Sequence, residues 1–289
     1  METAELLKKV RRIELKIKSL SKNIFSGEYH SAFKGRGMSF SEVRSYQYGD
    51  DVRNIDWNVT ARANEPFVKI FEEERELTLM ILVDVSGSSS FGSKNQRKSE
   101  VFTEICAMLA FSASQNNDKV GVILFSDKIE KFIPPKKGKQ HILRIIRELL
   151  DFTPNNSGTD IGFALQYLSN ILKKKAICFV LSDFQADNYD TALKIASRKH
   201  DIIGFRVADP LEAELPAVGL LRVKDPETGE TGWIDTHDRE TMRTYKLKFQ
   251  KNKDAFYRHF KKSKTGVIDI GIEESYVLAL LQFFKKRAS

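Results

Sequence analysis

The stretch LTLMILVDVSGSSS, residues 77–90, decides how the rest of the chain is interpreted. Its first half is a continuous apolar run, which is typical of a strand buried on both faces of a parallel sheet. The run ends at Asp84, and hydroxyl side chains follow at Ser86 and Ser88. Polar residues directly after a buried strand indicate either a turn that ends the strand or a site that binds a ligand through oxygen atoms.

The sequence around this stretch alternates between apolar runs and segments of helical periodicity. This alternation predicts an α/β fold, a doubly wound, mostly parallel sheet with helices on both faces. Pro134 and Pro135 cannot donate to a strand ladder, so they place 128–138 at a sheet edge. Further strands are expected at 119–127, 176–184 and 201–209, and helices at 98–115, 141–151, 160–172 and 192–200. A hairpin in 211–237, a helix over 237–263, a strand at 266–275 and a final helix at 276–287 are expected to complete the chain.

Composition limits the class of protein. The chain has 289 residues, of which 41% are hydrophobic, so it can form one large domain or two modest ones. Its net charge of +8 is concentrated at the ends, with +5 in residues 1–36 and +7 in residues 238–289. These basic ends could bind nucleic acid, anionic lipid or an acidic partner, but solvated lysine-rich helix faces explain them better because no nucleic-acid motif accompanies them.

The expected location is cytoplasmic. No apolar run approaches the roughly 18 residues that a membrane span needs. The N-terminus, METAELLKKVRRIELKIKSL, lacks the apolar core of a signal peptide and instead predicts an amphipathic helix. Cys106 and Cys178 both lie in apolar elements, which indicates reduced core thiols.

Two further loops carry oxygen-bearing side chains next to predicted strands and helices. NNSGTDIG (155–162) places Thr159 before a helix, and LSD (181–183) places Asp183 at the end of a strand. If the sheet order brings these loops to the stretch after Asp84, the donor set suits a hard cation such as Mg²⁺. An external carboxylate would complete its coordination. The alternative is a serine-rich turn, with Thr159 as the N-cap of the following helix.

The DVSGS, SGTD and LSD pieces resemble the metal-ion-dependent adhesion site of the von Willebrand factor A (vWA) domain. The resemblance covers roughly residues 77–210 and implies a vWA-like (Rossmann-like) fold. It also implies a bound Mg²⁺, or Mn²⁺ or Ca²⁺, and a protein partner that offers a carboxylate. The metal-site residues that it implies are Asp84, Ser86, Ser88, Thr159 and Asp183.

The segment FKGRGMSFSEVRSYQYGDDVRNIDWNVTARANEPFVKIFEEERE (33–76) resembles the bacterial family called domain of unknown function 58, as does DPLEAELPAVG (209–219). Many members of that family carry an N-terminal membrane hairpin that this chain lacks, which implies a form without a transmembrane segment. The family's frequent proximity to MoxR-type AAA+ ATPases implies an adaptor or co-chaperone role with such an ATPase.

Within this segment, GDDVRNIDW is dense in charge. One interpretation is a partner-binding platform, or paired carboxylates for acid–base chemistry. The favoured interpretation is structural, an ion-pair network that joins the N-terminal segment to the vWA core with Trp57 as an apolar plug. The residues concerned are Arg44, Asp50, Asp51, Arg53, Asp56, Trp57 and Arg62.

The sequence therefore predicts three parts and one main function. The parts are an N-terminal helix and β-rich segment (1–76), a vWA-like domain with the metal site (77–210), and a C-terminal hairpin, helix, strand and helix packed on that core (211–289). The function is a non-enzymatic, metal-dependent protein interaction. The alternatives are a Mg²⁺-dependent hydrolase, which would activate water at the metal, and nucleic-acid binding through the basic ends. No nucleotide-binding motif is present.

Overall fold

The computed structural model describes residues 8, 10–15, 24–33, 38–63, 65–73, 76–92 and 96–288. Its centre is a six-stranded sheet in the order β10-β7-β6-β3-β4-β5. Neighbouring strands are parallel except for β4 and β5. The strands are β3 (Thr78–Asp84), β4 (Lys119–Phe125), β5 (Ile129–Lys136), β6 (Ile177–Ser182), β7 (Asp201–Ala208) and β10 (Gly266–Gly271). The predicted fold class and the predicted edge strand at the two prolines are confirmed, and this edge strand is antiparallel to its neighbour β4.

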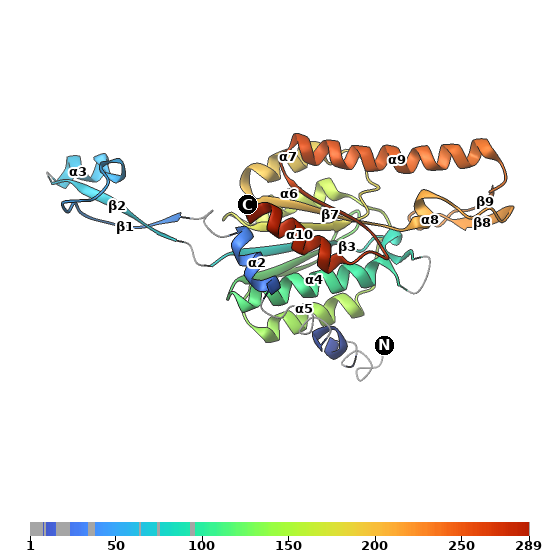
Figure 1. Ribbon diagram of the computed structural model, residues 1–289, viewed down its shortest axis with the longest axis horizontal. Coiled ribbons are helices and arrows are strands. Elements are labelled where there is room, and N and C mark those ends of the chain that lie inside the picture. Colours follow the sequence, from blue (N-terminus) through green and yellow to red (C-terminus); the bar gives the residue numbers. More distant parts are fainter. Residues whose placement is uncertain are drawn as a thin grey trace.

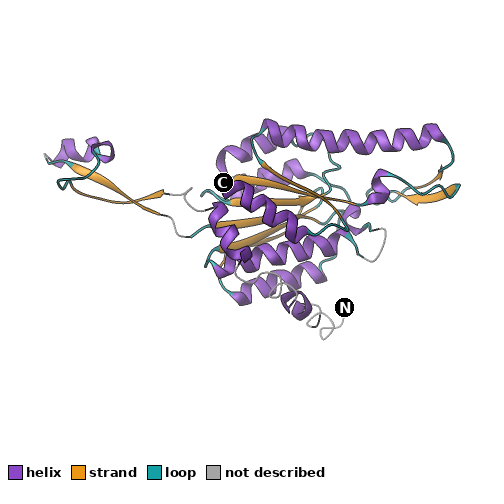
Figure 2. Cartoon of the chain, in the orientation of Figure 1, coloured by secondary structure: helices purple, strands orange, loops and turns teal. Residues whose placement is uncertain are grey.

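Helices cover both faces of this sheet (Figures 1 and 2). One face packs on α2 (Ile24–Phe33), α4 (Lys98–Gln115), α5 (Lys139–Asp151) and α10 (Tyr276–Ala288). The other packs on α6 (Ile161–Ile171), α7 (Asp190–Lys199) and α9 (Arg239–Lys262). Strand β3 alternates between the two layers, with Ile81 in the first and Leu82 in the second. Such two-sided burial explains why its sequence is a continuous apolar run.

Strand β3 lies where the sheet changes direction. The chain continues from β3 to β4 on one side and later returns to β6 on the other side. Ligands of open α/β sheets bind at such a switch point, outside the carboxyl ends of the strands. Asp84 ends β3 and Asp183 directly follows β6, so the fold places both carboxylates at this position.

Two antiparallel ribbons lie outside the central sheet. The N-terminal arm, residues 38–63 and 65–73, projects away from the sheet (Figure 1). It consists of β1 (Met38–Ser45), a short 3₁₀ turn η1 (Val52–Asn54), α3 (Trp57–Ala63) and β2 (Phe67–Glu73). The C-terminal hairpin, residues 220–235, pairs β8 (Leu220–Lys224) with β9 (Thr231–Asp235) and follows α8 (Pro210–Ala213). The hairpin was predicted, whereas α2 and α3 were not.

The amphipathic helix predicted at the N-terminus falls only partly within the described residues. Residues 10–15 are helical, and Val10 and Ile13 are buried in the first core layer. The remaining apolar positions of the predicted stripe, Leu6, Ile17 and Leu20, lie outside the described residues.

Candidate metal centre

Asp84 is fixed at the end of β3 by two hydrogen bonds. One carboxylate oxygen accepts the backbone N–H of Ser86 at 3.0 Å, and the other accepts the Ser182 hydroxyl at 2.6 Å. The side chain is 1% exposed. Burial, and then the charge of Asp183, raise the pKa of Asp84 to about 6. The site therefore contains a buried carboxylate whose ionised form a nearby positive charge would stabilise.

The hydroxyl groups of the quoted stretch lie side by side. The Oγ atoms of Ser86 and Ser88 are 3.1 Å apart, and both residues are buried. The chain forms a 3₁₀ turn, η2 (Gly87–Ser90), directly after Ser86. In this turn Ser89 donates to the carbonyl oxygen of Ser86 at 2.7 Å, which fixes the loop. Two adjacent hydroxyl oxygens are therefore presented beside the carboxylate of Asp84.

Asp183 lies across from them at the end of β6. It accepts a hydrogen bond from the side chain of Ser88 and one from the backbone N–H of Gln185. Its other oxygen is 2.6 Å from the ammonium group of Lys98, which is completely buried. Burial opposes ionisation of Asp183, but Lys98 outweighs it, so the pKa of Asp183 is lowered. The next residue, Phe184, has φ = +56°, which is a strained conformation for an aromatic residue. The direction of the chain therefore changes directly after Asp183.

Thr159, the remaining predicted ligand, lies in the loop before α6 and not directly after β3 or β6. Its loop is held by Glu130 of β5, which accepts hydrogen bonds from the backbone and side chains of Asn155 and Asn156. The loop is linked to the stretch after β3, because the N–H of Gly87 donates to the carbonyl of Ser157 at 2.8 Å. The N-cap of α6 is Asp160, whose side chain accepts from the Phe163 N–H. The alternative interpretation of Thr159 as that cap is therefore wrong.

The hydroxyl of Thr159 instead donates to the carboxylate of Glu227 at 2.8 Å. Glu227 is in the turn of the C-terminal hairpin and is half-buried. Burial raises its pKa, although the hydrogen bond from Thr159 opposes that shift. Glu227, 68 residues further along the chain, is therefore in direct contact with one of the predicted ligands.

Lys98 and Glu212 are site residues that the sequence analysis missed. The ammonium group of Lys98 also lies 2.5 Å from the carboxylate of Glu212 in α8. Desolvation favours the neutral amine, but the two carboxylates raise the pKa of Lys98 and keep it charged. Nothing in the sequence around Lys98 signals this role, because its partners are 85 and 114 residues away.

The arrangement fits a hard divalent cation. Carboxylate and hydroxyl oxygens are ligands that Mg²⁺ accepts, and the charge repulsion between Asp84 and Asp183 is what a bound cation would relieve. Within the described ranges, no three His, Cys, Asp or Glu side chains gather as a metal-binding group. A cation here would therefore depend on the hydroxyls of Ser86, Ser88 and Thr159 as much as on the carboxylates.

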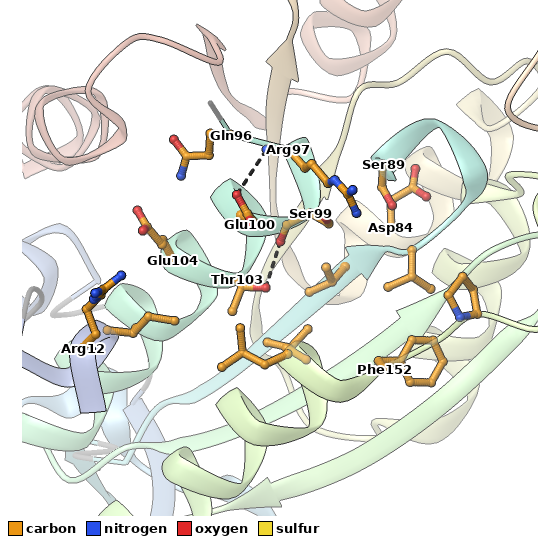
Figure 3. A pocket seen from close by; sticks show the side chains of 16 residues that line it. Arg12, Asp84, Ser89, Gln96, Arg97, Ser99, Glu100, Thr103, Glu104 and Phe152 are labelled. Atoms are coloured by element: carbon orange, nitrogen blue, oxygen red, sulfur yellow. Dashed lines mark hydrogen bonds between the residues drawn. The ribbon is translucent and has the colours of Figure 1, made fainter. Parts of the chain in front are cut away.

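A cavity of about 470 Å³ opens on the other side of Asp84 (Figure 3). Polar side chains from the start of α4, among them Arg97 and Glu100, line one wall, and Leu149 and Phe152 line another. Ser89, in the turn after β3, also lines this cavity. The cavity therefore adjoins the end of β3, although Asp84 itself is buried.

The residues of the predicted platform lie on the N-terminal arm, away from this site. Arg44 binds Asp50 through two hydrogen bonds of 2.8 and 2.7 Å, Arg53 pairs with Asp51 at 3.3 Å, and Lys69 pairs with Asp56 at 3.6 Å. Both partners of each pair are inside the arm. Trp57 is 69% exposed and Arg62 is exposed as well. The interpretation of these pairs as a link to the core, with Trp57 as an apolar plug, is therefore wrong.

Cys106 and Cys178 are free thiols in the core, and burial raises the pKa of both. None of the helices in the described part of the chain combines the length and apolar content that a membrane span requires.

Comparison with known proteins gives a family. The family model described as "Protein of unknown function DUF58" matches residues 42–255. "Uncharacterized protein Rv1480" of Mycobacterium tuberculosis is 28% identical over 232 residues, which cover 79% of this chain and 73% of that one. "Uncharacterized protein YeaD" of Bacillus subtilis is 28% identical over 109 residues, which cover 38% of this chain and 25% of that one.

Solved structures with similar folds include BatB from Bacteroides thetaiotaomicron and the VWA domain of SpRpn10. BatB is 17% identical with a TM-score of 0.48, and the match covers 73% of this chain and 98% of that one. The SpRpn10 domain is 8% identical with a TM-score of 0.38, and the match covers 71% and 94% of the two chains.

Proposed function

Because this chain belongs to the family described as protein of unknown function DUF58, whose description assigns no activity, we propose its function from its own site. We propose a non-enzymatic protein-interaction module that binds a carboxylate of a partner protein through a divalent cation. The supporting observation is the meeting of two buried carboxylates and two adjacent hydroxyls at the carboxyl ends of β3 and β6.

The residues that would hold the cation are Asp84, Ser86, Ser88, Thr159 and Asp183. Mg²⁺ suits these ligands best, with Mn²⁺ and Ca²⁺ as substitutes. When bound, the cation would supply an electrophilic centre that accepts an oxygen of the partner's carboxylate.

The protein's own residues prepare this site for a negatively charged partner. Ser182 and the N–H of Ser86 orient both oxygens of Asp84. Lys98 neutralises much of the charge of Asp183, which limits the repulsion that an incoming carboxylate would meet. Asp84 and Asp183 thus supply negative charge that attracts a cation, and Lys98 reduces the repulsion of an acidic side chain.

The partner class to test first is the MoxR-type AAA+ ATPase that the family resemblance implies, with this protein as adaptor or co-chaperone. Binding of the purified ATPase from the same organism should be measured on the immobilised chain in millimolar Mg²⁺ and again in chelator. We expect binding only with Mg²⁺, and its loss in the Ser86→Ala/Ser88→Ala variant. Ser45→Ala, on the exposed surface of the arm, is the matched control. Equal binding in chelator and in the double variant would contradict the proposal.

A further inference from the structure

The turn of the C-terminal hairpin lies directly on the loops of the candidate metal centre. The hydroxyl of Thr159 donates to the carboxylate of Glu227, and the hydroxyl of Ser157 donates to the carbonyl of the same residue. Every other residue of the stretch 224–231 is exposed, whereas Glu227 is half-buried. The turn therefore directs one carboxylate toward the site and leaves its remaining side chains in solvent.

The backbone of the turn is also shaped for this contact. Asp225 accepts the N–H groups of Glu227 and Thr228 at 2.8 and 3.0 Å, which fixes the turn from within. The carbonyl oxygen of Pro226 passes so close to Gly87 that a Cβ there would lie 1.9 Å from it. Only glycine permits this approach. The metal-site loop and the hairpin turn are therefore complementary at the level of the main chain.

The segment that leads into the hairpin is attached to the same site. Glu212 in α8 pairs with Lys98, and Lys98 pairs with Asp183. The segment from α8 to β9 therefore contacts the site at two points, through Glu212 before the hairpin and through Glu227 in its turn. Two attachments keep the carboxylate of Glu227 at high local concentration beside the predicted metal ligands.

We propose that Glu227 is the carboxylate that this chain presents to its own metal centre, so that the hairpin competes there with an acidic partner. This proposal rests on the proposed function. The hairpin is then a self-ligand: a partner's carboxylate reaches the cation only after Glu227 leaves. The contact of Glu227 with Thr159, itself a predicted ligand, is the observation that places it where the partner's carboxylate would bind.

The direct test uses Mn²⁺ as the probe, with the dissociation constant and the water-proton relaxation of bound Mn²⁺ as readouts. We expect Glu227→Gln to weaken Mn²⁺ binding at least about tenfold and to increase relaxation, because water replaces the lost carboxylate. Added acetate should then lower the relaxation of Glu227→Gln but leave the wild-type protein unchanged. Glu230→Gln removes the same charge from the exposed side of the same turn and should behave as wild type.

A steric variant tests the closure without changing any charge. Gly87→Ala should displace the turn and speed hydrogen–deuterium exchange of residues 220–235 in the presence of Mn²⁺. Gly232→Ala, in β9 with no atom within 4 Å of its added Cβ, is the control and should leave exchange unchanged.

The outcomes separate this inference from the proposed function. Wild-type protein that binds Mn²⁺ with the same affinity and relaxation as Glu227→Gln would overturn the self-ligand and leave the metal centre intact. Unchanged exchange of the hairpin in Gly87→Ala would overturn it as well. Failure of the wild-type protein to bind Mn²⁺ would overturn both proposals.

Discussion

The two antiparallel ribbons of this molecule each pair two strands, but they have opposite relations to the sheet. The N-terminal arm satisfies its charges internally, as in the pairs Arg44–Asp50 and Lys69–Asp56. It also leaves Trp57 exposed at its far end. The C-terminal hairpin instead brings Glu227 into hydrogen-bond contact with Thr159, one of the predicted metal ligands. A ribbon whose carboxylates pair within the ribbon only extends the surface of the fold. A ribbon whose carboxylate bonds to the central body can contribute to the site.

Carboxylates of the arm and three carboxylates at or next to the site have pKa values shifted in opposite directions, whereas Lys98 lowers the pKa of Asp183. In the arm, the hydrogen bonds from Arg44 lower the pKa of Asp50. Desolvation raises that of Asp56, but backbone N–H donors and Lys69 outweigh it and the pKa is lowered. At the site, burial raises the pKa values of Asp84, Glu212 and Glu227. The site holds negative charge that its own cation, Lys98, does not fully compensate.

The largest effect should come from Lys98→Met. Removal of this ammonium leaves Asp183 and Glu212 buried without their counter-charge, which should lower the free energy of unfolding by about 3–5 kcal/mol. Urea denaturation monitored by circular dichroism measures this. Lys119→Met is the control, because its side chain is 46% exposed and its pair with Glu76 should contribute less than about 1 kcal/mol. Equal losses in both variants would show that the buried triad has no special role.

An intermediate effect should follow from Asp84→Asn and should depend on pH. Since the pKa of Asp84 is raised from 3.8 to about 6, the folded state binds the proton more tightly than the unfolded state. Ionisation of Asp84 therefore costs stability as the pH rises through this window, and the cost is complete above pH 6. In chelator at pH 8, Asp84→Asn should be more stable than wild type by up to about 3 kcal/mol, and the difference should vanish below the unfolded-state pKa of 3.8. A difference that is the same at both pH values would contradict the assignment.

The smallest effect should come from the arm. Arg44→Met removes a partly exposed pair and should leave the urea midpoint of unfolding almost unchanged, because solvent screens such pairs. The affinity for Mn²⁺ should not change, because Arg44 and Asp50 pair with each other inside the arm. Urea denaturation and Mn²⁺ titration of the same variant measure both quantities. A weakened affinity for Mn²⁺ would show that the arm and the site are coupled, which contradicts the independence of the arm.

The parts of this structure that sequence predicted are those that depend on local pattern. The apolar run of β3 and the oxygen-bearing loops after β3 and β6 are readable because neighbouring residues carry the signal. Lys98, Glu212 and Glu227 were missed because each acts on residues distant in sequence. Trp57 was assigned to the interior because aromatic side chains are usually buried, but the arm exposes it.

Helix α2 shows the same limit within secondary structure. Its sequence, IFSGEYHSAF, contains a glycine and only weak amphipathic periodicity. The helix is held by tertiary contacts of Tyr29 and Phe33 with Phe284 in α10, at ring-centroid distances of 5.8 and 5.7 Å. Packing against Phe284, which lies 255 residues after Tyr29 and 251 after Phe33, therefore overrides a weak local preference, and no window of sequence could reveal it.

The central claim is that the carboxyl ends of β3 and β6 form a metal centre, and titration calorimetry of Mn²⁺ into chelator-treated protein tests it most directly. We predict one Mn²⁺ bound per chain, with affinity reduced at least about tenfold in both Asp84→Asn and Ser86→Ala. Asp50→Asn in the arm should bind as wild type does. Absence of binding to the wild-type protein at millimolar Mn²⁺, or equal binding by all four proteins, would contradict the claim.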